Sequence, residues 1–242
     1  MEQEMAIFRS ILFPVDFSER CRFAAPFVRM IAEQCHADLT VMHVIELPVS
    51  VYSTIGHEIM LDLPAMRRAA REQLETFVRA ELAGIKLRSA VEEGRAASSI
   101  AHFADEHGID LVMMPTHGCG PFRRALLGSV TAKVLHDASC PVWTNAHVEC
   151  PSAGTPLECK SMLCAVDLET KNIPLIRHGA ELGREFAATV RLVHAIPEAE
   201  SLPASHFDVE FRRFLFERAR DELRKMQAEA GTAFDFAWRA EV

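Results

Sequence analysis

The sequence predicts an α/β protein with a parallel, doubly wound sheet. In the first 147 residues, apolar runs of strand length alternate with amphipathic stretches of helix length. This alternation is typical of βαβ units, in which helices cover both faces of a parallel sheet. Five strand candidates predict a five-stranded sheet with the order 3-2-1-4-5. The second half begins the same pattern again, which predicts a partial second copy of the fold.

The strands are expected where short apolar runs occur, and the helices where apolar residues recur with a period near 3.6. Glycine- and proline-containing stretches separate them and are expected to be loops. In chain order, the first half is expected to contain strands at 10–16, 37–46, 84–94, 109–115 and 140–144, and helices at 18–35, 65–82, 97–107 and from 129 onward.

The second half is an internal repeat. Residues 161–197 align without a gap to residues 10–46 at a constant offset of 151, which places Asp167 on Asp16 and His194 on His43. Helical periodicity returns at 206–230, followed by a match to the third strand, but the sequence holds no counterpart of the fourth and fifth strands. We expect one domain at 1–147, a linker at 148–160 and a partial second repeat at 161–242.

The partial repeat raises a question about its first strand. In a 3-2-1-4-5 sheet this strand is central, so without a fourth strand it would be an unpaired, aggregation-prone edge. Two explanations stay open: another element covers the edge, or the sequence is a piece of a longer protein.

Composition excludes several functional classes. The chain is 49% hydrophobic and carries a net charge of −8, which argues against broad binding to nucleic acid. Seven cysteines without a C-x-x-C spacing encode neither a disulfide framework nor a zinc site. No apolar run reaches the ~20 residues of a membrane span, and the N-terminus does not resemble a signal peptide. We expect a cytoplasmic protein without a metal site.

The stretch from Pro115 to Val142 carries the strongest functional signal. A glycine turn at Gly118 follows a predicted strand, and a second one at Gly128 runs directly into a helix. The first free N–H groups of that helix, with the hydroxyls of Ser129 and Thr131, favour a phosphate-bearing ligand. The alternative is an ordinary loop in which Ser129 is only a helix cap.

The motifs ILFPVDFSE, VMHVIE and MPTHG-x9-GSVTAKVLHDASCPV resemble the universal stress protein family, over residues 8–147 and more faintly over 160–242. Proteins of this family have a five-stranded α/β fold, and one branch binds ATP through a motif written G-x2-G-x9-G-[ST]. Gly118, Gly128 and Ser129 match the last two thirds of it, whereas Pro115 stands where the motif has its first glycine. Because proline has no N–H to donate, this departure bears directly on nucleotide binding.

The resemblance implies an adenine nucleotide as ligand, namely ATP with or without Mg. Asp16 would lie beside the adenine, Val44 would offer backbone contacts, and the residues around Gly128 would surround the phosphates. The expected site comprises Val15, Asp16, Val44, Pro115, His117, Gly118, Gly128, Ser129, Val130 and Thr131. The alternatives are that Asp16 caps the helix after it and that His117 is a loop histidine without a catalytic partner.

No local spacing indicates a catalytic nucleophile, an acid–base pair or a metal cluster, so no catalytic residue is assigned. The first functional hypothesis is a nucleotide-binding stress or regulatory protein. The second is a nucleotide-free module of the same fold for dimerisation or docking, and the third is a slow ATPase. The resemblance also implies a homodimer, or pairing of the two repeats, through the last strand at Pro141–Thr144.

Overall fold

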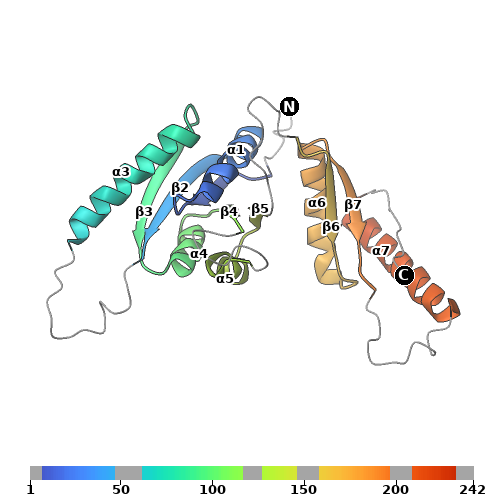
Figure 1. Cartoon of the computed structure of the whole chain (residues 1–242). Coiled ribbons are helices and arrows are strands. Elements are labelled where there is room, and N and C mark those ends of the chain that lie inside the picture. Colours follow the sequence, from blue (N-terminus) through green and yellow to red (C-terminus); the bar gives the residue numbers. More distant parts are fainter. Residues whose placement is uncertain (1–6, 47–61, 117–126, 146–157, 197–208, 233–242) are drawn as a thin grey trace, which may run out of the picture. The chain divides into compact units, whose positions relative to one another are not determined.

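The computed structural model describes residues 7–46, 62–116, 127–145, 158–196 and 209–232 (Figure 1). The chain divides into two compact units, Met1–Leu157 and Glu158–Val242. None of the helices in these ranges is both long enough and apolar enough to cross a membrane.

The first unit contains a five-stranded parallel sheet with the order β3-β2-β1-β4-β5, as the sequence predicts. Its central strand β1 is almost entirely buried, because Ile11, Leu12 and Phe13 are each 0% exposed. The five strands are β1 (Ser10–Pro14), β2 (Asp38–Ile45), β3 (Leu87–Glu93), β4 (Leu111–Pro115) and β5 (Val142–Asn145).

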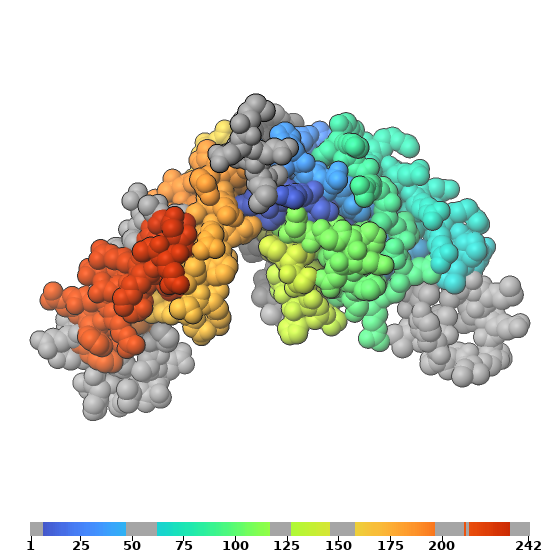
Figure 2. Space-filling view, turned by 180° about the vertical axis from the view of Figure 1, so that it is seen from behind, coloured from blue at the N-terminus to red at the C-terminus, as the bar shows by residue number. Residues whose placement is uncertain are grey.

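Helices cover both faces of this sheet. They are α1 (Glu19–Gln34), α3 (Leu63–Glu81), α4 (Ala96–Glu106) and α5 (Ser129–Asp137). The ring of Phe13 contacts Phe77 of α3, whereas Leu12, which points to the other face, packs in a cluster with Ile100 of α4 and Val134 of α5. Helices α4 and α5 lie side by side on that second face (Figures 1 and 2).

Polar side chains fix where the helices begin. Ser18 is the N-cap of α1, and Asp62 caps α3 by accepting a hydrogen bond from the N–H of Ala65 at 2.9 Å. The carboxylate of Glu46, just after β2, accepts from the N–H of Ala96 at 2.7 Å and so satisfies the start of α4. Such caps occupy donors that have no partner within the helix itself.

The second unit contains two parallel strands, β6 (Ser161–Ala165) and β7 (Thr189–Val193). They are accompanied by the short helix η1 (Thr170–Asn172) and by helices α6 (Ile173–Glu185) and α7 (Val209–Ala230). Its core is formed mainly by Cys164, Ile176, Leu192, Leu223 and Met226, so both long helices pack on one face of the two strands. The strand expected after Gly231 lies outside the described residues.

The backbone of β6–α6–β7 reproduces that of β1–α1–β2 at the offset of 151. Ser161 pairs with Thr189 as Ser10 pairs with Asp38. In both units the residue after the helix cap has a left-handed backbone, with φ of 51° at His36 and 48° at Ala187. The aligned histidines also make the same bond: His43 donates to the carbonyl of Val15 at 2.8 Å, and His194 to that of Val166 at 2.9 Å.

Candidate functional site

The candidate site lies at the carboxyl ends of β1 and β4, which are neighbours in the sheet. The chain leaves β1 toward α1 on one face and leaves β4 toward α5 on the opposite face. In open α/β sheets, the crevice where the chain turns to opposite faces is where ligands bind. The residues that follow β1 and those that begin α5 therefore converge on a favourable location.

Helix α5 is fastened to the end of β4 by two hydrogen bonds. The N–H of Gly128 donates to the carbonyl of Thr116 at 2.8 Å, and the hydroxyl of Thr131 donates to the carbonyl of Pro115 at 3.0 Å. Thr131 is 2% exposed, so its hydroxyl serves the fold and does not face a ligand. The N-terminus of α5 is thereby held at the carboxyl end of the central strands.

Among the described residues, no side chain caps the first turn of α5. Gly128 occupies the N-cap position, and Ser129 is the exposed first residue of the helix, so the reading of Ser129 as a cap does not apply. The N–H groups of Ser129, Val130 and Thr131 have no acceptor within the helix, and the positive end of the helix dipole lies at the same place. This is the arrangement that binds an anion.

Pro115 and Thr116 join the end of β4 to the neighbouring strand β5 by strand pairing and hydrogen bonds. Pro115 is buried and pairs in register with Asn145, and both the N–H and the hydroxyl of Thr116 donate to the Asn145 carbonyl, at 3.4 and 3.0 Å. The side-chain oxygen of Asn145 is buried and has no hydrogen-bond partner among the described residues. The sequence pattern does not predict that this atom is buried.

The loop after β1 is organised by Asp16. Its carboxylate accepts from the N–H of Ser18 at 3.0 Å and from the thiol of Cys21 at 3.1 Å, while the Ser18 hydroxyl caps the helix. Burial, together with the negative charge of Asp16, raises the pKa of the Cys21 thiol to about 12. Asp16 is nevertheless exposed to solvent, and a carboxylate can accept several hydrogen bonds.

Val15 and Val44 lie at the carboxyl ends of the neighbouring strands β1 and β2. The N–H of Val15 donates to Met42 at 2.8 Å and its carbonyl accepts from His43, so both of its polar groups are engaged. Val44 is half-buried and, like Val130 at the start of α5, packs against the core cluster of the second sheet face. The structure thus brings these two valines to the same face. His117 and Gly118 lie outside the described residues.

The conformation of Phe17 and its ring contacts were not predicted from the sequence. It has a left-handed backbone with φ of 62°, which is uncommon for a bulky residue. Its ring lies 4.4 Å from that of His43 and 6.1 Å from that of Phe77, between ring centroids. The loop after β1 is therefore fixed by aromatic contacts on one side and by the Asp16 carboxylate on the other.

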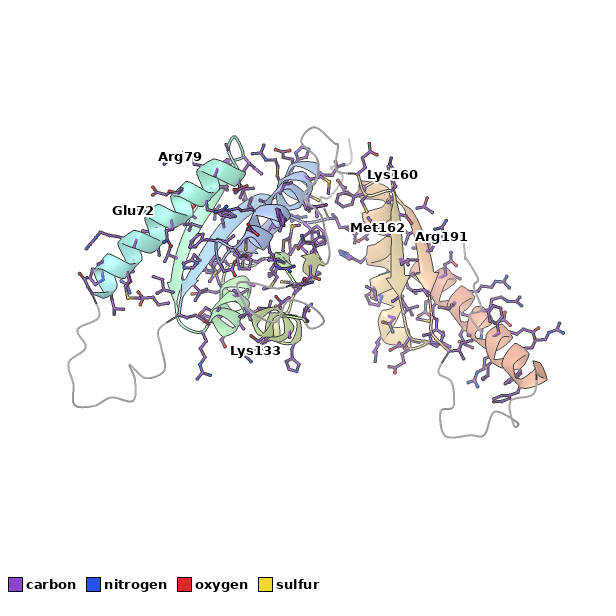
Figure 3. The ribbon with its side chains drawn as sticks, in the orientation of Figure 1. Glu72, Arg79, Lys133, Lys160, Met162 and Arg191 are labelled. Atoms are coloured by element: carbon purple, nitrogen blue, oxygen red, sulfur yellow. The ribbon has the colours of Figure 1, made fainter. Side chains whose placement is uncertain are left out.

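A separate cleft of about 480 Å³ lies between α1 and α3. Its lining includes Phe17, Arg22, Glu72 and Phe77 but none of the ten expected site residues; Glu72 is labelled in Figure 3. Arg22 and Glu81, which both line this cleft, form an ion pair 3.8 Å apart. Across the described ranges, no group of three or more His, Cys, Asp or Glu side chains is arranged to hold a metal ion.

Comparisons with known proteins agree on one family. A model of the universal stress protein family matches residues 7–144. A universal stress protein of Thermus aquaticus is 34% identical over 142 residues, which cover 56% of this chain and 97% of the relative. Universal stress protein MJ0531 of Methanocaldococcus jannaschii is 30% identical over 139 residues, 56% of this chain and 81% of that protein.

Solved structures extend the likeness of fold. The structure of protein MJ0577, 25% identical, matches with a TM-score of 0.50 over 59% of this chain and 99% of its own. A universal stress protein from Archaeoglobus fulgidus, 20% identical, matches 94% of this chain and 75% of its own with a TM-score of 0.63, so its fold likeness reaches into the second unit. With the family match spanning more than half of the sequence, the chain belongs to the universal stress protein family.

Proposed function

We propose that the first unit binds an adenine nucleotide, ATP in the first place, at the carboxyl ends of β1 and β4. The observation that carries this proposal is the uncapped N-terminus of α5, held beside the central strands by Gly128 and Thr131. Occupancy of the site would then shift a conformational or oligomeric equilibrium of a cytoplasmic stress-response protein.

The phosphates are assigned to the start of α5. The N–H groups of Ser129, Val130 and Thr131 and the exposed hydroxyl of Ser129 supply donors, and the helix dipole favours negative charge. Thr131 contributes its amide only, because its hydroxyl is bonded to Pro115. Any magnesium ion would be held mainly by the phosphates, since the described residues offer no cluster of ligands for it.

The base is assigned to the ends of β1 and β2. The exposed carboxylate of Asp16, which also accepts from Ser18 and Cys21, can accept a hydrogen bond from an amino or hydroxyl group of the ligand. Val44, half-buried beside the core, offers an apolar surface and backbone groups. The left-handed Phe17 fixes this loop, so the acceptor is held in place before the ligand arrives.

Pro115 is compatible with this site. The proline lacks an N–H, but its carbonyl receives the Thr131 hydroxyl and its side chain is buried in β4. Its contribution is to hold α5, and the phosphate donors assigned here come from α5 itself. The proposal therefore does not require the glycine that the family motif has at this position.

Titration calorimetry with ATP on the whole chain tests the proposal, with the Gly128→Asp and Gly128→Asn variants beside the wild type. Gly128 has φ −57° and ψ 145°, angles that any residue adopts, and Asp and Asn are both good N-caps. The two variants have nearly the same shape and differ in charge. We expect Gly128→Asp to weaken the binding of ATP at least about tenfold more than Gly128→Asn does, a difference in binding free energy of about 1.4 kcal/mol.

Two results would reject the proposed site. One is the absence of heat on titration together with no nucleotide released when the purified chain is denatured, and this result leaves the nucleotide-free module as the function of the fold. The other is equal affinity for ATP in all three proteins, which would place the bound ATP away from α5. ATP turnover that survives purification and disappears in Gly128→Asp would instead support a slow ATPase.

The proposal extends to the organisation of the chain. The second unit is proposed to be a partial second repeat, since its first strand, helix and second strand follow the geometry of the first unit. A homodimer, or pairing of the repeats, is proposed to form through β5, an edge strand on which Val142 and Trp143 are half-buried. Sedimentation of the whole chain with and without ATP measures this association.

A further inference from the structure

The cleft between α1 and α3 has the volume of a small-molecule site. It measures about 480 Å³, within the range of about 300–1,000 Å³ that such sites occupy. It lies on the face of the sheet opposite to α4 and α5, because Phe77 of α3 contacts Phe13 whereas Leu12 points to the other face. None of the ten expected nucleotide-site residues lines it, so the cleft is a separate feature of the first unit.

The most buried part of the cleft is aromatic. Phe77 is 5% exposed, less than any other lining residue, and its ring lies 6.1 Å from that of the half-buried Phe17, between centroids. The ring of Phe17 is also held by that of His43, 4.4 Å away. Ala69 and Ala80 carry only a methyl group, so they leave space in the lining beside the rings. An apolar body can therefore lie against both phenylalanines.

The charged side chains of the cleft favour a cation. Two carboxylates, those of Glu72 and Glu81, line it together with the single guanidinium of Arg22. Arg22 and Glu81 form an ion pair, so they largely neutralise each other. The carboxylate of Glu72 has no ion-pair or hydrogen-bond partner in the described part of the chain, where only its backbone carbonyl is engaged, by the hydroxyl of Thr76 at 2.8 Å. One negative charge therefore remains unneutralised in the lining.

The acceptors beside this charge suit a primary amine. Thr76 follows Glu72 by four residues and Gln73 by three, so all three side chains share one face of α3 and line the cleft. The amide oxygen of Gln73 and the hydroxyl oxygen of Thr76 are acceptors, and a primary ammonium group has three N–H donors. The lining stripe of α3 from Ala69 to Ala80 is about 16 Å long, which leaves room for a body of several carbon atoms.

We infer that this cleft binds a small primary amine with an aromatic or branched aliphatic body. The ammonium group lies at Glu72, which Figure 3 labels on α3, and the body lies against Phe17 and Phe77. The faces of the two rings add an electrostatic attraction for a cation, which an anion would not have. This inference goes beyond nucleotide binding, because no residue that carries it belongs to the expected nucleotide site.

Nuclear magnetic resonance on the isotope-labelled whole chain tests the inference, with 3-phenylpropylamine as the probe. This amine is a cation at neutral pH, and 3-phenylpropanoate, an anion with the same ring and the same number of carbon atoms, is titrated beside it. Glu72→Gln removes the charge and keeps the shape of the side chain. Glu75→Gln is the matched control, because Glu75 is exposed on α3 and does not line the cleft. Ala80→Leu fills part of the cleft from an exposed helical position.

We expect the amide signals of Phe17, Glu72 and their neighbours to shift saturably with the amine. A Kd on the order of 5 mM or tighter is typical of a fitting ligand of this size. Glu72→Gln should weaken the binding of the amine about threefold, since an exposed ion pair contributes modestly, and Glu75→Gln should bind it as the wild type does. Ala80→Leu should weaken it at least as much, because the leucine side chain occupies the space of the ligand.

Three results would overturn the inference. The first is the absence of a saturable shift in the signals of the cleft up to about 20 mM amine, well above the expected Kd. The second is binding of the anion as tightly as the amine. The third is an affinity for the amine that is unchanged in Glu72→Gln or in Ala80→Leu.

ATP titrations keep this test separate from that of the nucleotide site. Glu72→Gln should bind ATP as the wild type does, and Gly128→Asp should bind the amine as the wild type does. If Gly128→Asp loses the amine, or if the signals that shift are those at the start of α5, the amine occupies the nucleotide site and the inference is wrong. If the chain binds no ATP while the amine shifts the signals of the cleft, the inference stands and the proposed nucleotide site fails.

Discussion

Replacing Gly183 with alanine should destabilise the second unit, whereas replacing Gly179 should not. The two glycines lie one turn apart on α6 and both are buried against the sheet. A Cβ at Gly183 would lie 2.4 Å from the Cγ2 of Val190 and 3.2 Å from the carbonyl oxygen of Ala188. At Gly179 the nearest atom would be the Cys164 sulfur at 3.6 Å, an ordinary contact.

The change in the free energy of unfolding follows from two opposing effects. Alanine in a helix interior is favoured over glycine by roughly 0.5–1 kcal/mol, and this gain applies to both variants. Overpacking a well-filled core opposes it by roughly 1–3 kcal/mol, at Gly183 alone. Val190 is β-branched and 6% exposed, so it has little freedom to rotate away. We expect Gly183→Ala to lose about 1–2 kcal/mol and Gly179→Ala to gain up to about 1 kcal/mol.

Thermal unfolding of the whole chain, with hydrogen exchange followed in peptides of α6 and β7, measures the difference. For a unit of this size, each kcal/mol shifts the midpoint by about 4–8 °C. Exchange in β7 should become faster in Gly183→Ala and unchanged or slower in Gly179→Ala. If Gly183→Ala is as stable as Gly179→Ala, the added Cβ does not meet Val190, and α6 does not pack on β7 as closely as the structure shows.

Two further predictions concern ionisation. Because burial and Asp16 raise the pKa of the Cys21 thiol to about 12, iodoacetamide at pH 8.5 should modify Cys21 in the native chain far more slowly than the half-exposed Cys159, as measured by mass spectrometry. Equal rates would contradict the burial of the Cys21 thiol beside Asp16. The hydrogen bond from Lys133 holds the pKa of Asp137 below its usual value. The stabilisation from this ion pair is therefore present above about pH 4 and is lost as the pH falls through the pKa of Asp137 in the folded chain. NMR titration of Asp137 should show a midpoint below 3.8 that rises in Lys133→Met, and an unchanged midpoint would dismiss the ion pair.

The order of the strands could be predicted because it depends on the alternation of apolar runs with amphipathic stretches. Five apolar runs separated by amphipathic stretches leave few ways to build a doubly wound sheet, and the helix bounds differ from the expected ones by one or two residues. The strand starts differ by up to three residues: β3 begins at Leu87 and not at residue 84, and the last strand begins at Val142 and not at Cys140. Its first residues, Cys140 and Pro141, form the approach to the strand, and proline cannot donate to a ladder.

The local chemistry of the site could be predicted only in part. The sequence indicates that a glycine precedes a helix, but the bond from the Thr131 hydroxyl to Pro115 joins residues 16 positions apart and follows from how α5 docks on β4. The left-handed backbone of Phe17 was equally hidden, because sequence rules assign such conformations to glycine and asparagine. Contacts with His43 and Phe77 outweigh that local preference.

The two units together show which position reports on nucleotide binding. Asp167 accepts a hydrogen bond from the N–H of Glu169 at 3.0 Å, as Asp16 accepts one from Ser18. An aspartate at this place therefore organises the turn after the strand in both units. Loss of ATP binding in an Asp16 variant would be ambiguous, because the turn itself would change. Gly128 is the better position, since its structural bond to Thr116 is made by the backbone N–H, which Asp and Asn also have, and its backbone angles suit other residues. For this reason the charge at Gly128, and not the loss of Asp16, separates a nucleotide site from a structural turn.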